Sequence, residues 1–158
     1  MPYTRNEHNS RRRRDDWQHK LTHNLAKNHS LIVIEDLKLA NMTRSARGTI
    51  ESPGKNVRQK AGLNRSLQEV APGVIIRQLT YKCAWYGSTL IRVNPGYTSQ
   101  TCYECGHVCP DNRAAQAHFK CVWCNHENNA DVNAAKNILR RGLNAPDSGL
   151  CRLPVEAQ

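Results

Sequence analysis

The sequence has 158 residues, and its 23 Lys or Arg against 13 Asp or Glu give a formal net charge of +10. Apolar residues make up 39% of the chain. The longest aliphatic run, residues 31–34, is far shorter than the roughly 18 residues needed to cross a bilayer. A transmembrane protein is therefore excluded, and the polar N-terminal residues lack the apolar segment of a secretory signal peptide. We expect one modest domain that stays in the cytoplasm and makes no membrane contact.

The positive charge is concentrated in residues 1–70, which hold 14 Lys or Arg and 7 Asp or Glu. Each Lys or Arg that neutralises a phosphate releases condensed counterions, so this balance favours a nucleic-acid partner. The alternative for the arginine run is a solvated helix face that happens to be basic. We expect nucleic-acid contacts from eight basic residues: Arg11, Arg12, Arg13, Arg14, Lys55, Arg58, Lys60 and Arg65.

The first predicted element is a helix over residues 11–29, because its large apolar residues are spaced by four and form one stripe. These residues are Trp17, Leu21 and Leu25. A β-branched run at residues 31–34 then predicts a short buried strand that ends in the acid Glu35. Residues 36–62 are polar and basic, and they predict an irregular segment that contributes nothing to a core.

Helical spacing returns over residues 63–70, stops at Pro72-Gly73, and resumes over residues 74–86 until Gly87 ends it. A second strand is predicted over residues 89–93, closed by Asn94-Pro95. A cysteine-bearing loop unit follows, and then a helix from about residue 129 to residue 141. The order of elements predicts an α/β fold, although two strands are too few to make a stable sheet alone.

The cysteine-bearing unit contains two C-x-x-C pairs separated by 15 residues, which is the spacing of a structural zinc site with four thiolate ligands. The four expected ligands are Cys102, Cys105, Cys121 and Cys124. Four protein ligands leave no open position for catalysis, so we expect Zn²⁺ to stabilise the fold only. A C-x-x-C redox pair is the alternative, but that chemistry needs a single motif in a βαβ context.

Three further residues near these pairs could bind metal, and we count none of them as a ligand. Cys109 precedes a proline and has no pairing cysteine, so a free thiol is expected. His107 and His126 each follow the second cysteine of a pair by two residues, where a polar residue usually closes the turn.

Two acids occupy positions that need an explanation. Glu35 ends an aliphatic strand and must reach water or bind a positive group, while its neighbour Asp36 points to the other face. Asp131 starts the last helix, where an acid commonly caps the first turn and favours the helix dipole. A strand-end Glu and a helix-start Asp can also hold divalent cations that clamp a phosphodiester, which requires a third carboxylate.

The chain resembles the C-terminal half of the TnpB (OrfB) proteins of bacterial and archaeal insertion sequences, over residues 12–142 or so. The segments that carry the resemblance are Val33-Ile34-Glu35-Asp36-Leu37-Lys38, Pro53-Gly54-Lys55-Asn56-Val57, Gly62-Leu63-Asn64-Arg65-Ser66, Gln78-Leu79-x-Tyr81-Lys82, Trp85-Tyr86-Gly87, Tyr97-Thr98-Ser99-Gln100-x-Cys102-x-x-Cys105-Gly106-His107, Asn112-Arg113, Phe119-x-Cys121-x-x-Cys124 and Asn129-Ala130-Asp131-x-Asn133-Ala134-Ala135-x-Asn137-Ile138.

This resemblance implies a partial RNase H/RuvC-like fold with an inserted zinc ribbon, related to type V CRISPR effectors. In that family an RNA guide selects DNA, and a centre holding Mg²⁺ or Mn²⁺ cuts it. Glu35 matches the second catalytic carboxylate and Asp131 the third, while Arg113 falls where relatives carry an arginine near the scissile phosphate. The sequence departs from the family at Asn125, which replaces the usual glycine, and at Cys109-Pro110.

The resemblance also implies an organisation into four segments. Residues 1–96 form a partial RuvC-like region, residues 97–127 the zinc ribbon, residues 128–142 the final RuvC-like helix, and residues 143–158 a loose tail. The first catalytic Asp of the family has no match in this sequence, whose Asp-x-Gly lies in the tail. We therefore expect an N-terminally truncated prokaryotic protein that binds DNA or RNA but does not cut, unless a longer chain supplies that Asp.

A second interpretation is a zinc ribbon on a basic scaffold that binds nucleic acid, or regulates its element, without catalysis. A third is a thiol redox protein, in which the cysteines would cycle without stoichiometric zinc.

Overall fold

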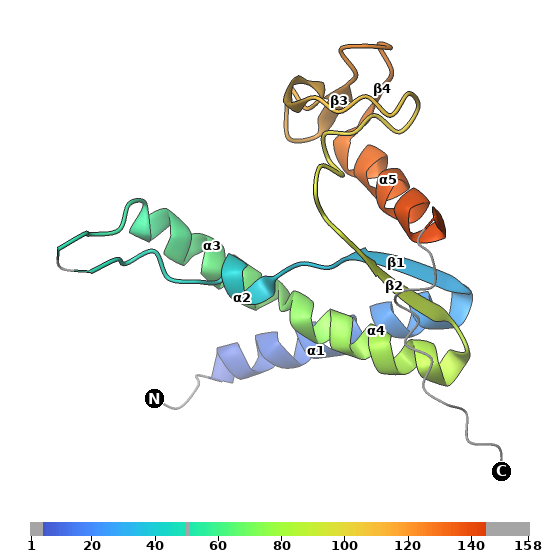
Figure 1. The fold of residues 1–158 in the computed structure, drawn as a ribbon. Coiled ribbons are helices and arrows are strands. Elements are labelled where there is room, and N and C mark those ends of the chain that lie inside the picture. Colours follow the sequence, from blue (N-terminus) through green and yellow to red (C-terminus); the bar gives the residue numbers. More distant parts are fainter. Residues whose placement is uncertain (1–4, 50, 145–158) are drawn as a thin grey trace. The chain divides into compact units, whose positions relative to one another are not determined.

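The computed structural model describes residues 5–49 and 51–144, which form two compact units (Figure 1). The first unit contains residues 5–30 and 38–88, and the second contains residues 31–37 and 89–144. The chain therefore passes between the units three times, and the two strands that begin at residues 31 and 89 each follow a helix of the first unit.

The first unit consists of four helices: α1 (Arg5–Asn28), α2 (Leu39–Met42), α3 (Val57–Val70) and α4 (Pro72–Tyr86). Helix α1 packs along α4 (Figure 1). It begins six residues before the start that apolar spacing predicted. No helix in the part of the chain that the structure describes is long and apolar enough to cross a membrane.

The buried face of α1 is not the apolar stripe expected from the sequence. Trp17 is 56% exposed, whereas Gln18, Thr22 and Ala26 are buried. The cause is polar pairing: the Gln18 side chain donates to the Val70 carbonyl at 2.7 Å, and the Thr22 hydroxyl lies 2.8 Å from an oxygen of Gln78. Hydrogen bonds pair the Gln18 amide nitrogen and the Thr22 hydroxyl, whereas the Gln18 side-chain oxygen is buried without a hydrogen-bond partner among the described residues. The prediction of the α1 core face was wrong by one position.

The break between α3 and α4 is confirmed at the predicted position. Ala71 adopts a left-handed conformation with φ of 48°, and Pro72 follows as the first residue of α4, where its missing N–H costs nothing. Gly87, also left-handed with φ of 70°, ends α4 as predicted.

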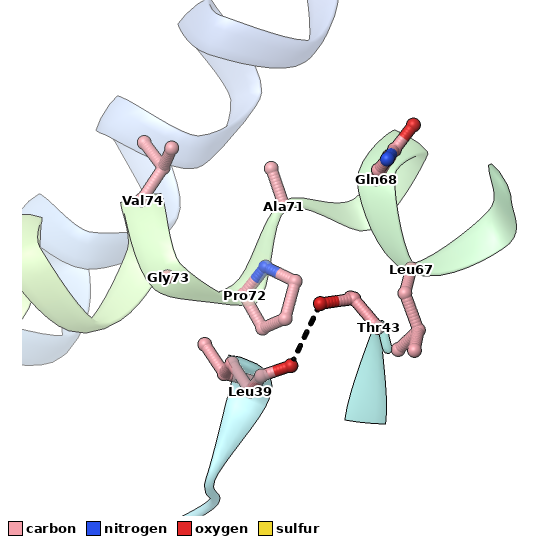
Figure 2. Close-up of a pocket in the computed structure, with 8 residues that line it drawn as sticks. All are labelled: Leu39, Thr43, Leu67, Gln68, Ala71, Pro72, Gly73 and Val74. Atoms are coloured by element: carbon pink, nitrogen blue, oxygen red, sulfur yellow. Dashed lines mark hydrogen bonds between the residues drawn. The ribbon is translucent and has the colours of Figure 1, made fainter. Parts of the chain in front are cut away.

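The segment expected to be irregular contains regular structure at both ends. Residues 39–42 form α2, and α3 already begins at Val57. Helix α2 lies beside the α3–α4 break, where Leu39, Leu67 and Pro72 contribute to an apolar pocket of about 350 Å³ (Figure 2). The Thr43 hydroxyl donates to the Leu39 carbonyl at 3.0 Å and closes the short helix. Leu39 and Met42 are half-buried, and the other two residues of α2 are exposed.

The second unit contains a parallel pair of strands, β1 (Leu31–Glu35) and β2 (Thr89–Val93), with Glu35 aligned to Val93. Both strands lie where the sequence predicted them. Strand β1 is half-buried along its whole length, not buried as expected. A two-stranded sheet leaves part of each strand in contact with water.

The rest of the second unit is the cysteine-bearing unit and one long helix. A short 3₁₀ turn (Pro110–Asn112) precedes the antiparallel pair β3 (His118–Lys120) and β4 (Glu127–Asn129). Helix α5 (Ala130–Asn144) follows at once and lies against β1 and β2. It includes residues 143 and 144, which were expected to belong to a loose tail. The remainder of that expected tail, from residue 145, lies outside the described residues, as does Cys151.

The contact between α5 and β1 depends on a glycine. A Cβ atom built on Gly142 would stand 2.4 Å and 2.6 Å from the two γ-carbons of Val33. No real Cβ atom accepts that distance, so the absent side chain at position 142 lets the helix approach the strand.

We expect Gly142→Ala to lower the free energy of unfolding of the second unit by about 1–3 kcal/mol, because the added methyl overpacks this contact. Gly62 is a matched control, since it lies in α3 with no atom within 4 Å of its Cβ position. Gly62→Ala should raise stability by about 0.4–1 kcal/mol through helix propensity. Amide hydrogen exchange in β1 measures the first effect, and unchanged exchange in Gly142→Ala would contradict the proposed packing.

Candidate functional site

The four cysteines predicted as metal ligands lie together in the second unit. Their sulfur atoms are all within 4.8 Å of one another. The Cys102 and Cys124 sulfurs are 3.7 Å apart, and the Cys105 and Cys121 sulfurs are 3.6 Å apart. Tetrahedral Zn–S bonds of about 2.3 Å place sulfurs roughly 3.8 Å apart, so this cluster fits a four-coordinate metal ion.

The electrostatics of the cluster also favour a cation. Burial opposes ionisation of Cys121, but backbone N–H groups of Cys124 and Trp123 outweigh it and lower the pKa to about 7. The His126 N–H favours the Cys124 thiolate, yet burial and the neighbouring cysteine sulfurs raise that pKa to about 12. Burial also raises the pKa of Cys102. Thiolates this close repel one another, and a divalent cation would remove that repulsion.

A fully buried amide joins the two cysteine turns. The Asn112 side chain donates to the carbonyls of Gln100 at 2.9 Å and His107 at 3.2 Å, and it accepts from the Val122 N–H at 2.9 Å. Gln100 and His107 flank the first cysteine pair, and Val122 lies inside the second. One side chain therefore fixes the separation of the two halves of the site.

Three neighbouring side chains, those of Cys109, His107 and His126, lie outside the four-cysteine cluster. The Cys109 sulfur lies 3.8 Å from a carboxylate oxygen of Asp111 and is not among the clustered sulfurs. His107 stacks on the exposed ring of Trp123, with centroids 5.9 Å apart. The His126 ring does not belong to the cluster either.

Two buried asparagines fasten α5 to the cysteine-bearing unit. Asn133 donates to the Thr101 carbonyl at 2.8 Å and accepts from the Tyr103 N–H at 3.0 Å. Asn137, one turn later, donates to the carbonyls of Thr98 at 3.1 Å and Thr101 at 2.7 Å. These bonds satisfy the backbone on both sides of Cys102 and set the position of α5 relative to the first cysteine pair.

The same backbone segment reaches Glu35. The Thr98 hydroxyl donates to a carboxylate oxygen of Glu35 at 2.6 Å, while the Thr98 carbonyl accepts from Asn137. Glu35 at the end of β1 is thus connected to α5 through one residue. Asp36 takes a different direction and lies 3.9 Å from Arg92.

Asp131 is free of the capping role that its position suggested. The Asn129 side chain accepts from the N–H groups of Asp131 at 2.9 Å and Val132 at 3.2 Å, so Asn129 caps α5. The Asp131 side chain is 85% exposed, with a guanidinium nitrogen of Arg113 at 3.8 Å. Arg113 also donates to the Gln116 carbonyl at 3.0 Å. The structure therefore brings Arg113 and Asp131 together.

The relation between the two acids follows from these bonds. Asp131 precedes Asn137 by six residues, which is about 9 Å along a helix. Among the described residues, the four cysteines form a group of at least three side chains within metal-binding range, and neither acid belongs to such a group. A divalent ion shared by Glu35 and Asp131 stays a prediction.

The basic residues expected to bind nucleic acid have different surroundings. Most are exposed in the first unit, on α1, in the segment after α2, or on α3. Arg14 donates to the Glu69 carbonyl at 3.2 Å, and Lys60 donates to the Met42 carbonyl at 2.6 Å. These two side chains support the fold, which reduces their availability for phosphate.

Sequence reasoning missed the buried amides and the threonine that organise the site. Asn133 and Asn137 are spaced by four in the last predicted helix, and that polar spacing could have indicated a buried hydrogen-bonding face. Asn112 and Thr98 lie in loops, where no periodic signal marks them.

The chain matches the family model of the Cas12f1-like TNB domain over residues 73–138. It is 50% identical over 129 residues to the protein named "Putative RNA-guided DNA endonuclease InsQ" of Escherichia coli (strain K12), which covers 82% of this chain. It is 48% identical over 62 residues to the CRISPR-associated endodeoxyribonuclease Cas12f1 of Sulfoacidibacillus thermotolerans, which covers 39% of this chain. The chain is a TnpB-type protein related to type V effectors.

The fold of this TnpB-type chain has a counterpart among solved structures. A chain in the cryo-EM structure of the Cas12f1-sgRNA-target DNA complex matches 83% of it with a TM-score of 0.55 and 25% identity. The described residues therefore have a mixed α/β fold similar to Cas12f1. The chain spans 32% of the E. coli relative, 15% of the Sulfoacidibacillus relative and 34% of the solved chain.

We expect the TnpB-type chain to bind one Co²⁺ in a tetrahedral thiolate site, giving the visible absorption of four-coordinate cobalt. Cys105→Ser should weaken this spectrum because one thiolate is lost. Cys109→Ser is the matched control, since that sulfur lies outside the cluster. Equal effects of the two substitutions would contradict the ligand assignment.

We expect Asn129→Ala to lower the free energy of unfolding by about 1 kcal/mol, because it removes the cap of α5. Asp131→Asn should change it by less than about 0.5 kcal/mol, because the carboxylate is exposed and makes no capping bond. Urea unfolding of the two variants checks the difference. A larger loss in Asp131→Asn would mean that this acid serves mainly to hold the helix.

Proposed function

We propose that this chain carries the RuvC-like catalytic region and the zinc ribbon of an RNA-guided, metal-dependent DNA endonuclease encoded by a transposable element. Glu35 and Asp131 would hold Mg²⁺ or Mn²⁺, and Arg113 would stabilise charge on the scissile phosphate. The four clustered cysteines would hold a structural Zn²⁺. DNA and a guide RNA would be its partners.

The observation that carries this proposal is the state of Asp131. An acid in the first turn of a helix usually serves as a cap, yet Asn129 takes that role here and leaves the carboxylate exposed beside Arg113. The same helix is joined through Asn137 and Thr98 to Glu35. The names of the relatives, RNA-guided DNA endonuclease and endodeoxyribonuclease, support the same chemistry.

The metal would supply most of the chemistry of cleavage. Divalent ions bound to carboxylates activate a water and stabilise the leaving oxygen of a phosphodiester. Within this chain, Thr98 would hold the Glu35 carboxylate in one orientation and α5 would present Asp131. A guanidinium nitrogen of Arg113 lies 3.8 Å from a carboxylate oxygen of Asp131, so Arg113 would be close to a phosphate bound near that acid.

The zinc assignment rests on the donor set. Four thiolates at tetrahedral spacing are typical of structural Zn²⁺, and none of the four would be free to exchange for substrate. Asn112 would hold the two cysteine turns in register, and Asn133 and Asn137 would pass that order to α5.

A non-catalytic nucleic-acid-binding module is the second candidate function, favoured by the net charge of +10. The two candidates differ in one respect. Binding through phosphate contacts is steeply salt-dependent and does not require Glu35, whereas cleavage does.

We expect the 158-residue polypeptide alone to bind single-stranded DNA in Mg²⁺ or Mn²⁺ without cutting it, since two carboxylates hold the ions incompletely.

Cleavage should appear when the amino-terminal part of the E. coli relative and its guide RNA are added. Glu35→Ala and Asp131→Ala should then lower the rate by about 100-fold or more. Arg113→Ala should lower it by about 100-fold.

Glu69→Gln is the matched control, because this acid is exposed on α3 and its side chain has no role in the site. Cleavage that survives Glu35→Ala would contradict the nuclease proposal. Glu35-dependent cleavage by the polypeptide alone would contradict the expectation of inactivity.

NMR line broadening by paramagnetic Mn²⁺ gives a readout that does not depend on cleavage. The amide signals of Glu35 and Asp131 should broaden in the unsubstituted chain, and they should broaden less in Asp131→Asn.

A further inference from the structure

A second pocket, of about 540 Å³, opens between α1 and α4 in the first unit, away from all the residues assigned above. Its lining is polar or basic, and none of it is acidic: His19, Lys20, His23, Asn24 and Lys82. A pocket with this lining is suited to an anion, so the surroundings of its charged groups decide what it can bind.

Lys82 is the buried cation of the pocket. It is 6% exposed, and its ammonium donates to the His19 carbonyl and to the Thr22 hydroxyl, both at 2.7 Å. In the part of the chain that the structure describes, no carboxylate lies within 4 Å of this nitrogen. A buried cation without a counter-charge is unfavourable, and burial lowers the pKa of Lys82 accordingly.

The contact with Lys82 also bears on the tautomer of the neighbouring His19 ring. Its nitrogen lies 3.4 Å from Nδ1 of His19. An ammonium cannot accept a hydrogen bond, so Nδ1 must be the acceptor and the proton of the neutral imidazole must sit on Nε2. His19 is thereby left with an N–H donor on its other side.

The second histidine, His23, also has its Nδ1 atom engaged. Nδ1 of His23 lies 2.8 Å from the Tyr86 hydroxyl, and the two rings meet edge to face. A hydroxyl can donate to Nδ1 or accept from it, so this contact leaves Nε2 of His23 without a hydrogen-bond partner among the described residues but does not fix its tautomer. Asn24 adds an exposed amide, and Lys20, although it donates to Asp16 at 2.7 Å, keeps further N–H groups.

We propose that this pocket binds a phosphate group. The buried Lys82 would supply the attraction and gain its missing counter-charge, while the Nε2–H group of His19, the Asn24 amide and Lys20 would supply directional donors. His23 would add a further donor in the tautomer in which Tyr86 donates to its Nδ1 atom. Charge-assisted hydrogen bonds of this kind are the strong ones in phosphate recognition. The phosphate can belong to a nucleic-acid backbone or be free in solution, and the experiment separates these sources.

The first measurement follows the histidine ring signals by NMR in the full chain. Titration with inorganic phosphate should shift the Nε2 signals of His19 and His23, and chloride at equal ionic strength should not. A short single-stranded DNA forms the second arm, with binding measured by fluorescence anisotropy over a range of salt concentrations.

Two variants test the pocket in both arms. Lys82→Met removes the charge, and we expect about 3–10-fold weaker DNA binding, with a salt slope smaller by about one. Asn24→Ala changes an exposed amide without touching the α1–α4 contact, and we expect about 3-fold weaker binding. Lys27→Ala is the matched control, because it removes the same charge from α1 outside the pocket.

Each outcome decides the proposal. Ring shifts with phosphate and weaker DNA binding in both pocket variants support a backbone-phosphate site. Ring shifts with phosphate, but DNA binding weakened no more than in Lys27→Ala, support a site for free phosphate. The proposal would be overturned if phosphate caused no shift of the histidine ring signals. It would also be overturned if Asn24→Ala and Lys27→Ala had equal effects on the binding of phosphate and of DNA. If Lys82→Met fails to fold, Asn24→Ala and the ring signals still give the answer.

Discussion

The arrangement of the second unit depends on buried amide side chains that satisfy loop carbonyls. Asn133 and Asn137 take the carbonyls of Thr98 and Thr101, the loop residues just before Cys102. Because an unsatisfied carbonyl in a buried place is costly, α5 has one favourable position along this loop. That position fixes the first cysteine turn beside Asn133 and, through Asn137 and Thr98, the carboxylate of Glu35.

Hydrogen bonds therefore connect the proposed zinc site to the proposed catalytic residue Glu35. Asn112 holds the two cysteine turns together, and α5 begins directly after β4, which belongs to the same unit. Metal binding by the cysteines would stabilise the turn that the asparagines of α5 recognise. A structural ion bound by the cysteines would in this way help to position the Glu35 carboxylate, which it does not contact, through the hydrogen bonds of Asn133, Asn137 and Thr98.

How much of this the sequence could predict depends on the kind of signal. The cysteine cluster, the helix break at Pro72 and strands β1 and β2 were predictable, because each rests on a local rule of geometry, whereas the three-residue strands β3 and β4 were not predicted. The core face of α1 was wrong, since apolar spacing cannot reveal that Gln18 and Thr22 find hydrogen-bond partners on the neighbouring helix. The position of Asp131 predicted a helix cap, but Asn129 caps α5 in the structure. Thr98 could not be recognised at all, because its importance comes from residues far away in the chain.

Positions along helix α5 differ in their tolerance of change. Its asparagines are committed to the loop and Gly142 to β1, whereas Asp131 contacts solvent and one arginine. If Asp131 has the proposed role, its loss would remove cleavage and leave the protein folded, whereas a change at Asn133, Asn137 or Gly142 would disturb the architecture itself.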